Sequence, residues 1–577
     1  MSQSEFPRTR GEENIEQAFV TSAGGPVENV ISLKESEETL RVEDQTNTEI
    51  MHEPVRQQYG SPSSYQFRRV ASKTLVSFGP DDPENPFHWG KGKKFFVVVS
   101  GMMQVMNSTI GSSLPSGAMD FIAEDLNITT SEQFVLPISL FLVGYVIGPL
   151  ICGPMSEQYG RRWPLTIGYV MFLVFTMACA LAPSLPALLV FRLFSGMAAA
   201  APISIITGTY ADVYDDPTKR GRALAWFMAC TTLGPIISPF MSGFVATVSW
   251  RWAFWLGLII AGASCPFIIF YPETYGPVLL HKRAKKLRKE TGDQSIVAPM
   301  DLMCRNFRET MAITLSRPFR MIIGEYIVSF TCLYLSLAYA IFYLYFQAYP
   351  IIFQGVYGMS PGVAGLTYLP IGIGAFIACG IFIWYDGYLA RAKERGLKWA
   401  HNEDYRRLPL ACIGGPLYVV SLFWLGWTAS SDIHWVVPMM SGVIFGLAYE
   451  LIFMAMLNYL SDAYEIYSAS AQSAASCCRS ICGALLPLAA RPMFDRLGIS
   501  WACSLIAFLS LGVSLIPFAF IYWGRTIRDN SKFCQQLRQL KEEERRAWEQ
   551  ANAGNQADDV EKARTAAEPG ESDADRV

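Results

Sequence analysis

The chain contains about twelve apolar runs, each roughly long enough to cross a lipid bilayer and each interrupted by very few charges. A hydrocarbon core about 30 Å thick needs around 20 helical residues to cross it, and the segments 134–151 and 501–523 meet that requirement. Hydrophobic residues make up 51% of the sequence and charged residues 17%, which is typical of a membrane protein rather than of several soluble domains. The sequence therefore predicts an all-α membrane protein.

The apolar runs form two groups of six, which a polar segment separates. The predicted spans lie at 94–117, 134–153, 163–182, 187–210, 223–247, 251–271, 320–346, 363–385, 409–428, 433–457, 473–490 and 500–523. We expect an N-terminal six-helix half at 93–271, a central loop at 272–319 and a C-terminal six-helix half at 320–524. The tails, 1–92 and 525–577, lack apolar periodicity and are expected to be mostly disordered.

Lys and Arg gather in alternate connections between the predicted spans. The basic connections contain Arg161 and Arg162, then Lys219, Arg220 and Arg222, then the cluster at 282–289, then Arg391, Lys393, Arg395, Lys398, Arg406 and Arg407; the opposite connections contain Arg251, Arg491 and Arg496. Basic loops stay in the cytosol, so both tails and the central loop are expected there. For the cluster at 282–289 we expect a topogenic, solvated helix, with binding of anionic lipid as the alternative.

Several functional classes are disfavoured by what the sequence lacks. Cys477, Cys478 and Cys482 cluster, but no His accompanies them, so a metal site is not expected. There is no G-x-x-x-x-G-K-[ST] loop, which disfavours direct use of ATP. There is also no basic, aromatic-rich array for nucleic acid. We therefore expect no cofactor and no enzymatic activity, and we expect the partners to be small molecules, protons and the bilayer.

A polar loop with regularly spaced glycines and charges follows the second span. Its sequence, 153–162, contains Gly153, Glu157, Gly160, Arg161 and Arg162. Glycines let two helix ends approach closely, and a carboxylate with an Arg pair makes charge-assisted bonds that hold helix ends in one state. This loop resembles the G-x-x-x-D-x-x-G-R-R loop of the major facilitator superfamily, with Glu in place of Asp.

The resemblance extends to the second half and to the fourth span. Asp386-Gly387 followed by Arg391 is a degenerate echo of the loop, as expected if the two halves descend from one repeat. Arg192 lies within the apolar fourth span, at the position of the intramembrane Arg of the superfamily's drug antiporters, which implies a role in proton coupling. Snorkelling to the membrane surface is the alternative. Asp212, at the cytosolic end of the span, matches the acid that pairs with the glycine-containing loop in such transporters.

The fifth span contains closely spaced small residues and prolines, among them Gly234, Pro235, Pro239 and Gly243. Such residues thin and bend a helix and let spans pack tightly. The segment resembles the antiporter motif G-P-x-x-G-P-x-x-G-G of proton-driven drug exporters, with Ser238 and Ser242 in place of glycines. A kinked helix with a purely structural role is the alternative.

Further segments resemble the twelve-span fungal drug:proton antiporters, especially their polyamine and multidrug exporter branch. They include 85–89, 250–255, 458–464 and 479–483. The resemblance covers about 90–530, and it implies the major facilitator fold with twelve transmembrane helices, alternating access, and export across the plasma membrane.

The proton carrier is expected to be a carboxylate. All five histidines lie outside the spans or at an end of one. Glu325 in the seventh span and Glu450 in the tenth are the candidates, because burial disfavours the charged form of a carboxyl group. Either acid could instead be a structural hydrogen-bonding residue.

The seventh span is rich in aromatic residues, which offer broad apolar and cation-binding faces. Tyr334, Tyr343 and Phe346, with Asn107 and Gln347, are the candidate substrate-binding residues. The alternative is that the aromatic stripe serves packing or forms an interfacial belt.

Together these features favour a monomeric transporter that exports amphipathic or cationic small molecules, such as drugs, toxins, polyamines or secondary metabolites, in exchange for protons. A proton-coupled nutrient importer is one alternative, since Pro272-Glu-Thr274 resembles a sugar-porter signature, and a non-transporting membrane sensor is another. We expect a glycan at Asn127, in Asn127-Ile-Thr129, whereas the sequon at Asn107 lies inside the first span.

Overall fold

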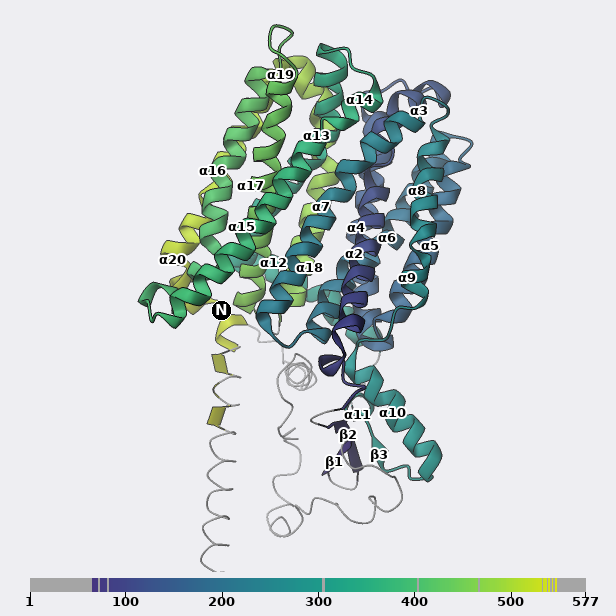
Figure 1. Ribbon diagram of the computed structural model, residues 1–577, viewed down its shortest axis with the longest axis vertical. Helices are drawn as coiled ribbons and strands as arrows, with labels where there is room; N and C mark the ends of the chain where they lie inside the picture. Colours follow the sequence, from purple (N-terminus) through teal and green to yellow (C-terminus); the bar gives the residue numbers. More distant parts are fainter. Residues whose placement is uncertain are drawn as a thin grey trace, which may run out of the picture.

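The computed structural model describes residues 65–546 apart from short gaps at 71–72, 80–81, 303–306, 402–403, 465–466, 532, 537, 540–541 and 543–544. The outer parts of both predicted tails, 1–64 and 547–577, lie outside the described residues. Figure 1 shows a bundle of long helices with a small sheet below one end. We call this end, where the first long helix begins at Lys91, the sheet end, and the opposite end the far end.

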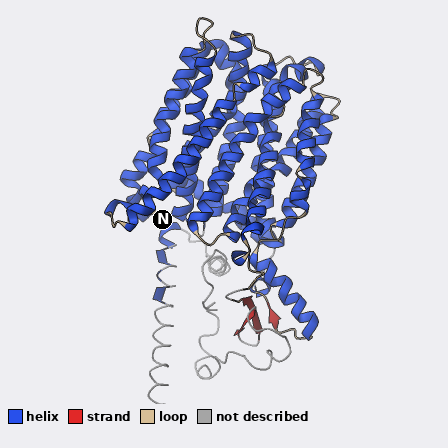
Figure 2. Ribbon diagram, in the orientation of Figure 1, coloured by secondary structure: helices blue, strands red, loops and turns tan. Residues whose placement is uncertain are grey.

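The N-terminal half consists of α2 (Lys91–Ser113), α3 (Met119–Asp125), α4 (Ser131–Tyr159), α5 (Arg162–Ala180), α6 (Leu185–Val213), α7 (Pro217–Val245), α8 (Arg251–Ala263) and α9 (Cys265–Ile269). The C-terminal half consists of α13 (Tyr326–Tyr349), η4 (Pro350–Val356), α14 (Pro361–Leu366), α15 (Leu369–Glu394), α16 (Asp404–Thr428), α17 (Val436–Tyr464), α18 (Ser468–Leu485), η7 (Leu486–Ala489), α19 (Ala490–Ser514) and α20 (Ile516–Asn530). Helices dominate the whole bundle (Figure 2).

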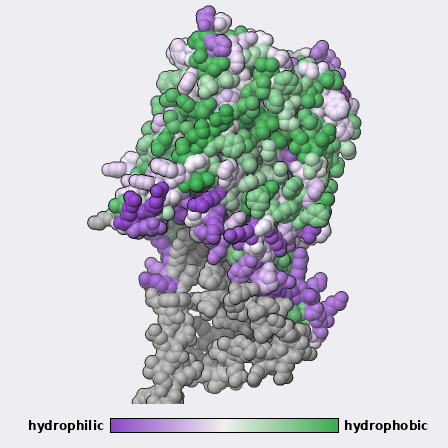
Figure 3. Space-filling model, viewed as in Figure 1, coloured by the Kyte–Doolittle hydropathy of each residue, from purple (hydrophilic) through white to green (hydrophobic). Residues whose placement is uncertain are grey.

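The described helices account for the twelve predicted spans. Ten helical segments are long and apolar enough to cross a membrane, and one of them, Ser468–Asn530, covers both the eleventh and the twelfth predicted span. It bends sharply at Gly498, where φ is 73°. The short α8, continued by α9, covers the sixth. On the face that Figure 3 shows, an apolar belt lies between two polar ends of the bundle.

Close backbone contacts join equivalent helices in the two halves. In the N-terminal half a Cβ on Gly196 of α6 would collide with the Phe141 carbonyl of α4, and in the C-terminal half a Cβ on Gly446 of α17 would collide with the Ile371 carbonyl of α15. Small residues at such crossings let membrane helices pack through their backbones. The two halves meet mainly where α4 packs on α18 and where α7 packs on α14 and α15.

The seventh span is not the continuous helix that the apolar run at 320–346 predicts. The helix α12 (Phe307–Gly324) ends just before Glu325, and α13 begins just after it. The backbone of Glu325 is extended, and its buried carboxylate accepts hydrogen bonds from the Tyr464 hydroxyl at 2.9 Å and the Phe533 N–H at 3.4 Å. Glu325 therefore lies at a junction beside the end of α17, not inside a membrane helix.

A small sheet at the sheet end corrects part of the prediction for the N-terminal tail. Strands β1 (Tyr65–Val70) and β2 (Lys73–Phe78) are antiparallel, and β3 (Ile296–Val297) pairs parallel to β2. The helix α10 (Gly276–Thr291), with α11 (Pro299–Leu302) after it, packs on this sheet through a cluster of buried apolar side chains. The prediction that 1–92 is mostly disordered thus did not foresee the two strands in the described part of that segment. Short strands that pair with a distant segment carry too little periodicity to be recognised.

Candidate functional site

Arg192 lies in the first half of α6 and is 1% exposed. Its guanidinium donates three hydrogen bonds of 2.7 Å, to the carbonyl oxygens of Pro137, Gly111 and Ser112. The Gly111 carbonyl has no helical donor, because the residue four positions later is Pro115, which has no N–H. Arg192 thus replaces a missing backbone donor at the end of α2, and its burial excludes snorkelling to the membrane surface.

Polar side chains join the two halves inside the bundle. The hydroxyl groups of Ser112 in α2 and Tyr343 in α13 are 2.9 Å apart and share a hydrogen bond. Ser139 in α4 donates to the carbonyl of Ala484 in α18 at 2.7 Å. Ser112 is also one of the residues whose carbonyl Arg192 holds, so the arginine positions a contact between the halves.

Glu450 provides a third link between the halves. This residue of α17 is 1% exposed, and its Oε2 accepts a 2.7 Å hydrogen bond from Thr232 in α7. Its other oxygen, Oε1, is buried and has no hydrogen-bond partner among the described residues. The ion pairs recorded in the described part of the C-terminal half do not include Glu450. A protonated carboxyl group donates as well as accepts, so gain or loss of a proton would alter this link.

Arg479 in α18 is a second basic residue inside the bundle, and it is only partly buried. Its guanidinium lies 5.4 Å from the ring centre of Tyr339 and 5.9 Å from that of Phe453. Its Nε is buried without a hydrogen-bond partner among the described residues, and a terminal nitrogen makes a long 3.4 Å bond to Ser476 of its own helix. Tyr145 of α4 lies within electrostatic range, which places Arg479 where the halves meet.

The five predicted substrate-binding residues are not all brought together. Tyr343 contacts both Ser112 and Phe346 at the interface between the halves, and Gln347 and Phe346 line a far-end cavity of about 130 Å³ that both halves form. The other two face the interior of their own halves. Asn107 donates to the Tyr169 hydroxyl at 2.9 Å, and Tyr334 lies against Gly415.

The proline-rich segment of α7 packs tightly on α2 and α14. A Cβ on Gly234 would collide with Thr109, and one on Gly243 would lie 2.7 Å from the Pro361 carbonyl. The Pro235 carbonyl accepts a 3.1 Å hydrogen bond from Ser113 of α2.

Next along α7, the Ser238 hydroxyl donates to the Ile110 carbonyl at 3.1 Å. Pro239 and the Ser242 hydroxyl line the space that Gly117 leaves free. The two serines that replace motif glycines are therefore fully buried at these contacts.

A cluster of charged groups ties the ends of α4, α5 and α6 together at the sheet end. Arg161 forms an ion pair with Asp212 at 3.1 Å, donates to the Ser156 hydroxyl at 2.9 Å, and lies 4.7 Å from the ring centre of Tyr275. Glu157, in the last turn of α4, lies within electrostatic range of Arg161. The pairing that the sequence predicts between Asp212 and the loop is thus present.

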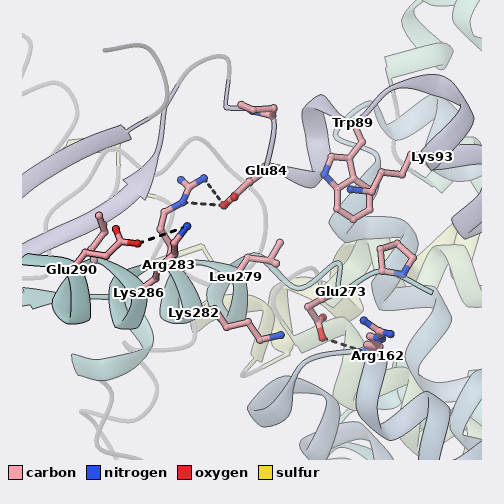
Figure 4. A pocket seen from close by; sticks show the side chains of 13 residues that line it. Glu84, Trp89, Lys93, Arg162, Glu273, Leu279, Lys282, Arg283, Lys286 and Glu290 are labelled. Carbon is pink, nitrogen blue, oxygen red and sulfur yellow. Dashed lines mark hydrogen bonds and ion pairs between the residues drawn. The ribbon is translucent and has the colours of Figure 1, made fainter. Parts of the chain in front are cut away.

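Glu273 completes this cluster, and the sequence analysis did not assign it a site role. Its carboxylate accepts hydrogen bonds from the backbone N–H groups of Arg161 at 2.8 Å and Arg162 at 3.3 Å, and so caps α5. Figure 4 shows Glu273 beside Arg162. Gly160 has φ of 90°, and a Cβ there would collide with the carboxylate. Gly153, by contrast, has open space around it. The sequence signal that could have identified Glu273 was its position, since it is an acid that directly follows the sixth span. The start of α5, which it caps, has no capping side chain of its own.

A cavity of about 520 Å³ lies beside Glu273, between α10 and the start of α2 (Figure 4). Arg283 of α10 pairs there with Glu84 at 2.6 Å and with the buried Asp82. Burial acts to raise the pKa of the Asp82 carboxyl, but hydrogen bonds from Arg283 and from the backbone, together with the charge of Arg283, outweigh it and lower that pKa. These pairs hold the segment before α2 against the central segment.

Asn127 lies in the exposed turn between α3 and α4 at the far end, with φ of 52°. Asn107 is 4% exposed inside α2. The two sequons therefore differ in accessibility in the way that the sequence predicts.

Comparison with known proteins identifies the family. The sequence profile of the Major Facilitator Superfamily matches residues 101–487. The chain belongs to this superfamily.

Efflux pump FUB11 of Gibberella moniliformis is 36% identical over 85% of this chain and 83% of its own length. The citrinin biosynthesis cluster MFS transporter mrr1 of Monascus ruber is 36% identical over 79% and 91%. Among solved structures, the bacterial proton:xylose symporter XylE has a TM-score of 0.55 at 15% identity, covering 75% of this chain and 97% of its own. The chain is a multi-pass secondary transporter and not an enzyme.

The superfamily's repeated halves explain a second charged cluster at the sheet end. Arg407, at the start of α16, lies 3.3 Å from Asp462 near the end of α17 and 3.9 Å from Asp386 in α15. These residues occupy the places that Arg161, Asp212 and Glu157 occupy in the first half. Of the residues in the predicted echo, Asp386 takes part in this cluster, whereas the Nε of Arg391 donates to the Gly387 carbonyl of its own helix. Arg407 lies too far along the chain from Asp386 for a loop motif to include it.

Proposed function

We propose that this chain exports amphipathic small molecules in exchange for protons, by alternating access to a site between its two halves. The observation that carries the proposal is the buried Glu450 carboxyl group, which bridges to Thr232 of the other half and has one oxygen unpaired among the described residues. Protonation of Glu450 changes a contact between the two halves, which must move relative to each other during transport. An antiporter requires such a link between proton binding and movement. The relatives named as efflux pumps support export over import.

The two other residues predicted for proton coupling receive supporting roles. Arg192 is the fixed cation that holds the end of α2, and so positions Ser112 against Tyr343. Glu325 holds the start of α13 against Tyr464 and Phe533 at the sheet end. We therefore assign the transported proton to Glu450.

Substrate contact is assigned to Tyr343, Phe346 and Gln347, which lie where the halves meet. Two of the relatives belong to biosynthesis clusters, those of citrinin and ascochitine, which favours a secondary metabolite as cargo. The charge of the cargo is a separate question.

The sheet end is assigned to the cytosol of a plasma-membrane protein that functions as a monomer. The basic connections converge there, and the positive-inside rule places such loops in the cytosol. The cluster of Arg161, Asp212 and Glu273 then acts as a cytosolic latch that closes and opens during transport. The packed glycines and prolines of α7 keep α2 and α14 in register during that movement.

The test is uptake into inside-out vesicles that contain the purified protein, with an acidic lumen. A panel of amphipathic dyes, polyamines and aromatic acids would be offered, with and without the pH gradient. Each charge that moves down about 100 mV supplies about 2.3 kcal/mol, enough for roughly fiftyfold accumulation. We expect at least one compound to accumulate only with the gradient. Accumulation with the reversed gradient would indicate an importer, and no flux of any compound would favour a sensor.

A further inference from the structure

Arg479 stands out among the charged side chains inside the bundle. An uncompensated Arg in the centre of a membrane helix costs about 2.5–3.5 kcal/mol or more, so such residues are normally paired. Arg192 meets this cost with three carbonyl oxygens. The Nε of Arg479 is buried without a hydrogen-bond partner among the described residues, and the hydrogen bond to Ser476 is 3.4 Å long. Among the described residues, no carboxylate forms an ion pair with it.

The surroundings of Arg479 match a flat molecule with an acidic group. Tyr339 and Phe453 present their rings to the guanidinium, and Tyr449 packs 4.5 Å from Phe453, so aromatic faces lie beside the charge. A guanidinium is planar and binds a carboxylate through two parallel hydrogen bonds. Gly483, one helical turn further along α18, lies against Tyr339, which places this face of α18 toward α13.

The charge balance at the interface also favours an anion. Arg192 and Arg479 both lie within electrostatic range of Tyr145, and Glu450 is the acid that joins α17 to α7. When Glu450 is ionised, as it is in the substrate-carrying state of an antiporter, the two arginines still leave one net positive charge. A cationic substrate would meet repulsion there, whereas an anion would supply the missing partner of Arg479.

We propose that Arg479 anchors the acidic group of the exported molecule, so that the substrates are aromatic organic anions. This proposal rests on the proposed export function and narrows its substrate class. It also fixes the electrical signature of transport. Exchange of one monoanion for one proton moves two charges across the membrane per cycle, whereas exchange of a monocation for one proton moves none.

The test uses three probes of matched size and different charge: 1-naphthoate, the neutral 1-naphthamide and the cationic 1-naphthylmethylamine. Binding to purified protein is measured first. We expect naphthoate to bind at least tenfold more tightly than the amide or the amine. In Arg479→Gln we expect at least a tenfold loss for naphthoate and less than a twofold change for the amide, and Arg479→Lys should restore part of the preference. Arg496→Gln, at an exposed arginine of α19, is the matched control and should change nothing.

Measuring flux in the same vesicles tests the anion proposal and the export function separately. With the pH gradient held constant, an inside-positive potential should increase the accumulation of naphthoate. If the cargo were a monocation, the same potential would leave its accumulation unchanged. Preference for the amine, or a preference for naphthoate that survives in folded Arg479→Gln protein, overturns the anion proposal. Arg479-dependent binding of naphthoate without proton-driven flux overturns the antiport function and supports the anion site.

Discussion

In the N-terminal half, the guanidinium of Arg192 donates three hydrogen bonds to carbonyl oxygens of its own half. In the C-terminal half, the Nε of Arg479 and the Oε1 of Glu450 are buried without hydrogen-bond partners among the described residues. The first arrangement completes a helix end that Pro115 leaves open, and it is stable without any ligand. The second leaves polar groups open to a proton or a substrate. Under the proposed function, buried charges that are fully bonded within one half are structural, and those that are not carry the transport chemistry.

The largest effect is expected from Arg192→Ala, which should abolish transport and lower the melting temperature of the purified protein, although the protein still reaches the membrane. The Gly111 carbonyl would lose its only donor among the described residues, and a buried unsatisfied carbonyl costs about 1–3 kcal/mol. Arg479→Gln is the matched comparison, and its melting temperature should stay the same or rise. Equal destabilisation by the two variants would contradict the view that Arg192 stabilises its half and Arg479 does not.

The two charged clusters at the sheet end provide the next comparison. Arg161 has an acid at 3.1 Å, a hydroxyl at 2.9 Å and an aromatic face, whereas the acids of Arg407 lie at 3.3 and 3.9 Å. Hydrogen bonds to charged groups contribute about 1.5–3 kcal/mol. We expect Arg161→Gln to slow the initial rate of transport about tenfold and Arg407→Gln to slow it less. A larger loss in Arg407→Gln would show that the second cluster is the main latch.

A smaller effect is expected from Gly160→Ala. With φ of 90° and ψ of 169°, Gly160 lies in a backbone region that is unfavourable for alanine by about 1–3 kcal/mol, and the alanine Cβ would push on the Glu273 carboxylate that caps α5. Gly153→Ala, in the same loop sequence but with open space around it, should be neutral. Melting temperature and transport rate would be measured for both. If the two variants behave alike, the Glu273 cap does not constrain the loop.

The smallest effect concerns the far end of the N-terminal half. Asn127→Gln should remove a glycosidase-sensitive mass shift and leave the transport rate unchanged, because the residue is exposed and far from the links between the halves. A mass shift that persists in this variant would mean that the topology is inverted or that another residue carries the glycan.

The sequence reveals the spans, the charged loop after the second span and the buried charges, because long apolar runs and isolated charges are local patterns. It does not reveal how those charges are satisfied. Arg192 is bonded to backbone carbonyls, and Thr232 and Glu450 are 218 residues apart, so neither pairing has a motif. The apolar run that contains Glu325 hides a helix break, where Glu325 is bonded by the distant residues Tyr464 and Phe533. For the same reason Asn107 and Tyr334, which have the right residue types for a pocket, face the interior of their own halves.

The most direct test of the account compares Glu450→Gln with Glu325→Gln in proton-driven accumulation, measured in the same vesicles as substrate binding. Gln keeps the size and hydrogen bonding of the acid but cannot release a proton. We predict that Glu450→Gln still binds substrate but no longer accumulates it in response to the pH gradient. Glu325→Gln should respond to the gradient as the unmodified protein does. Uphill accumulation by Glu450→Gln at the unmodified rate would contradict the assignment of the proton to Glu450.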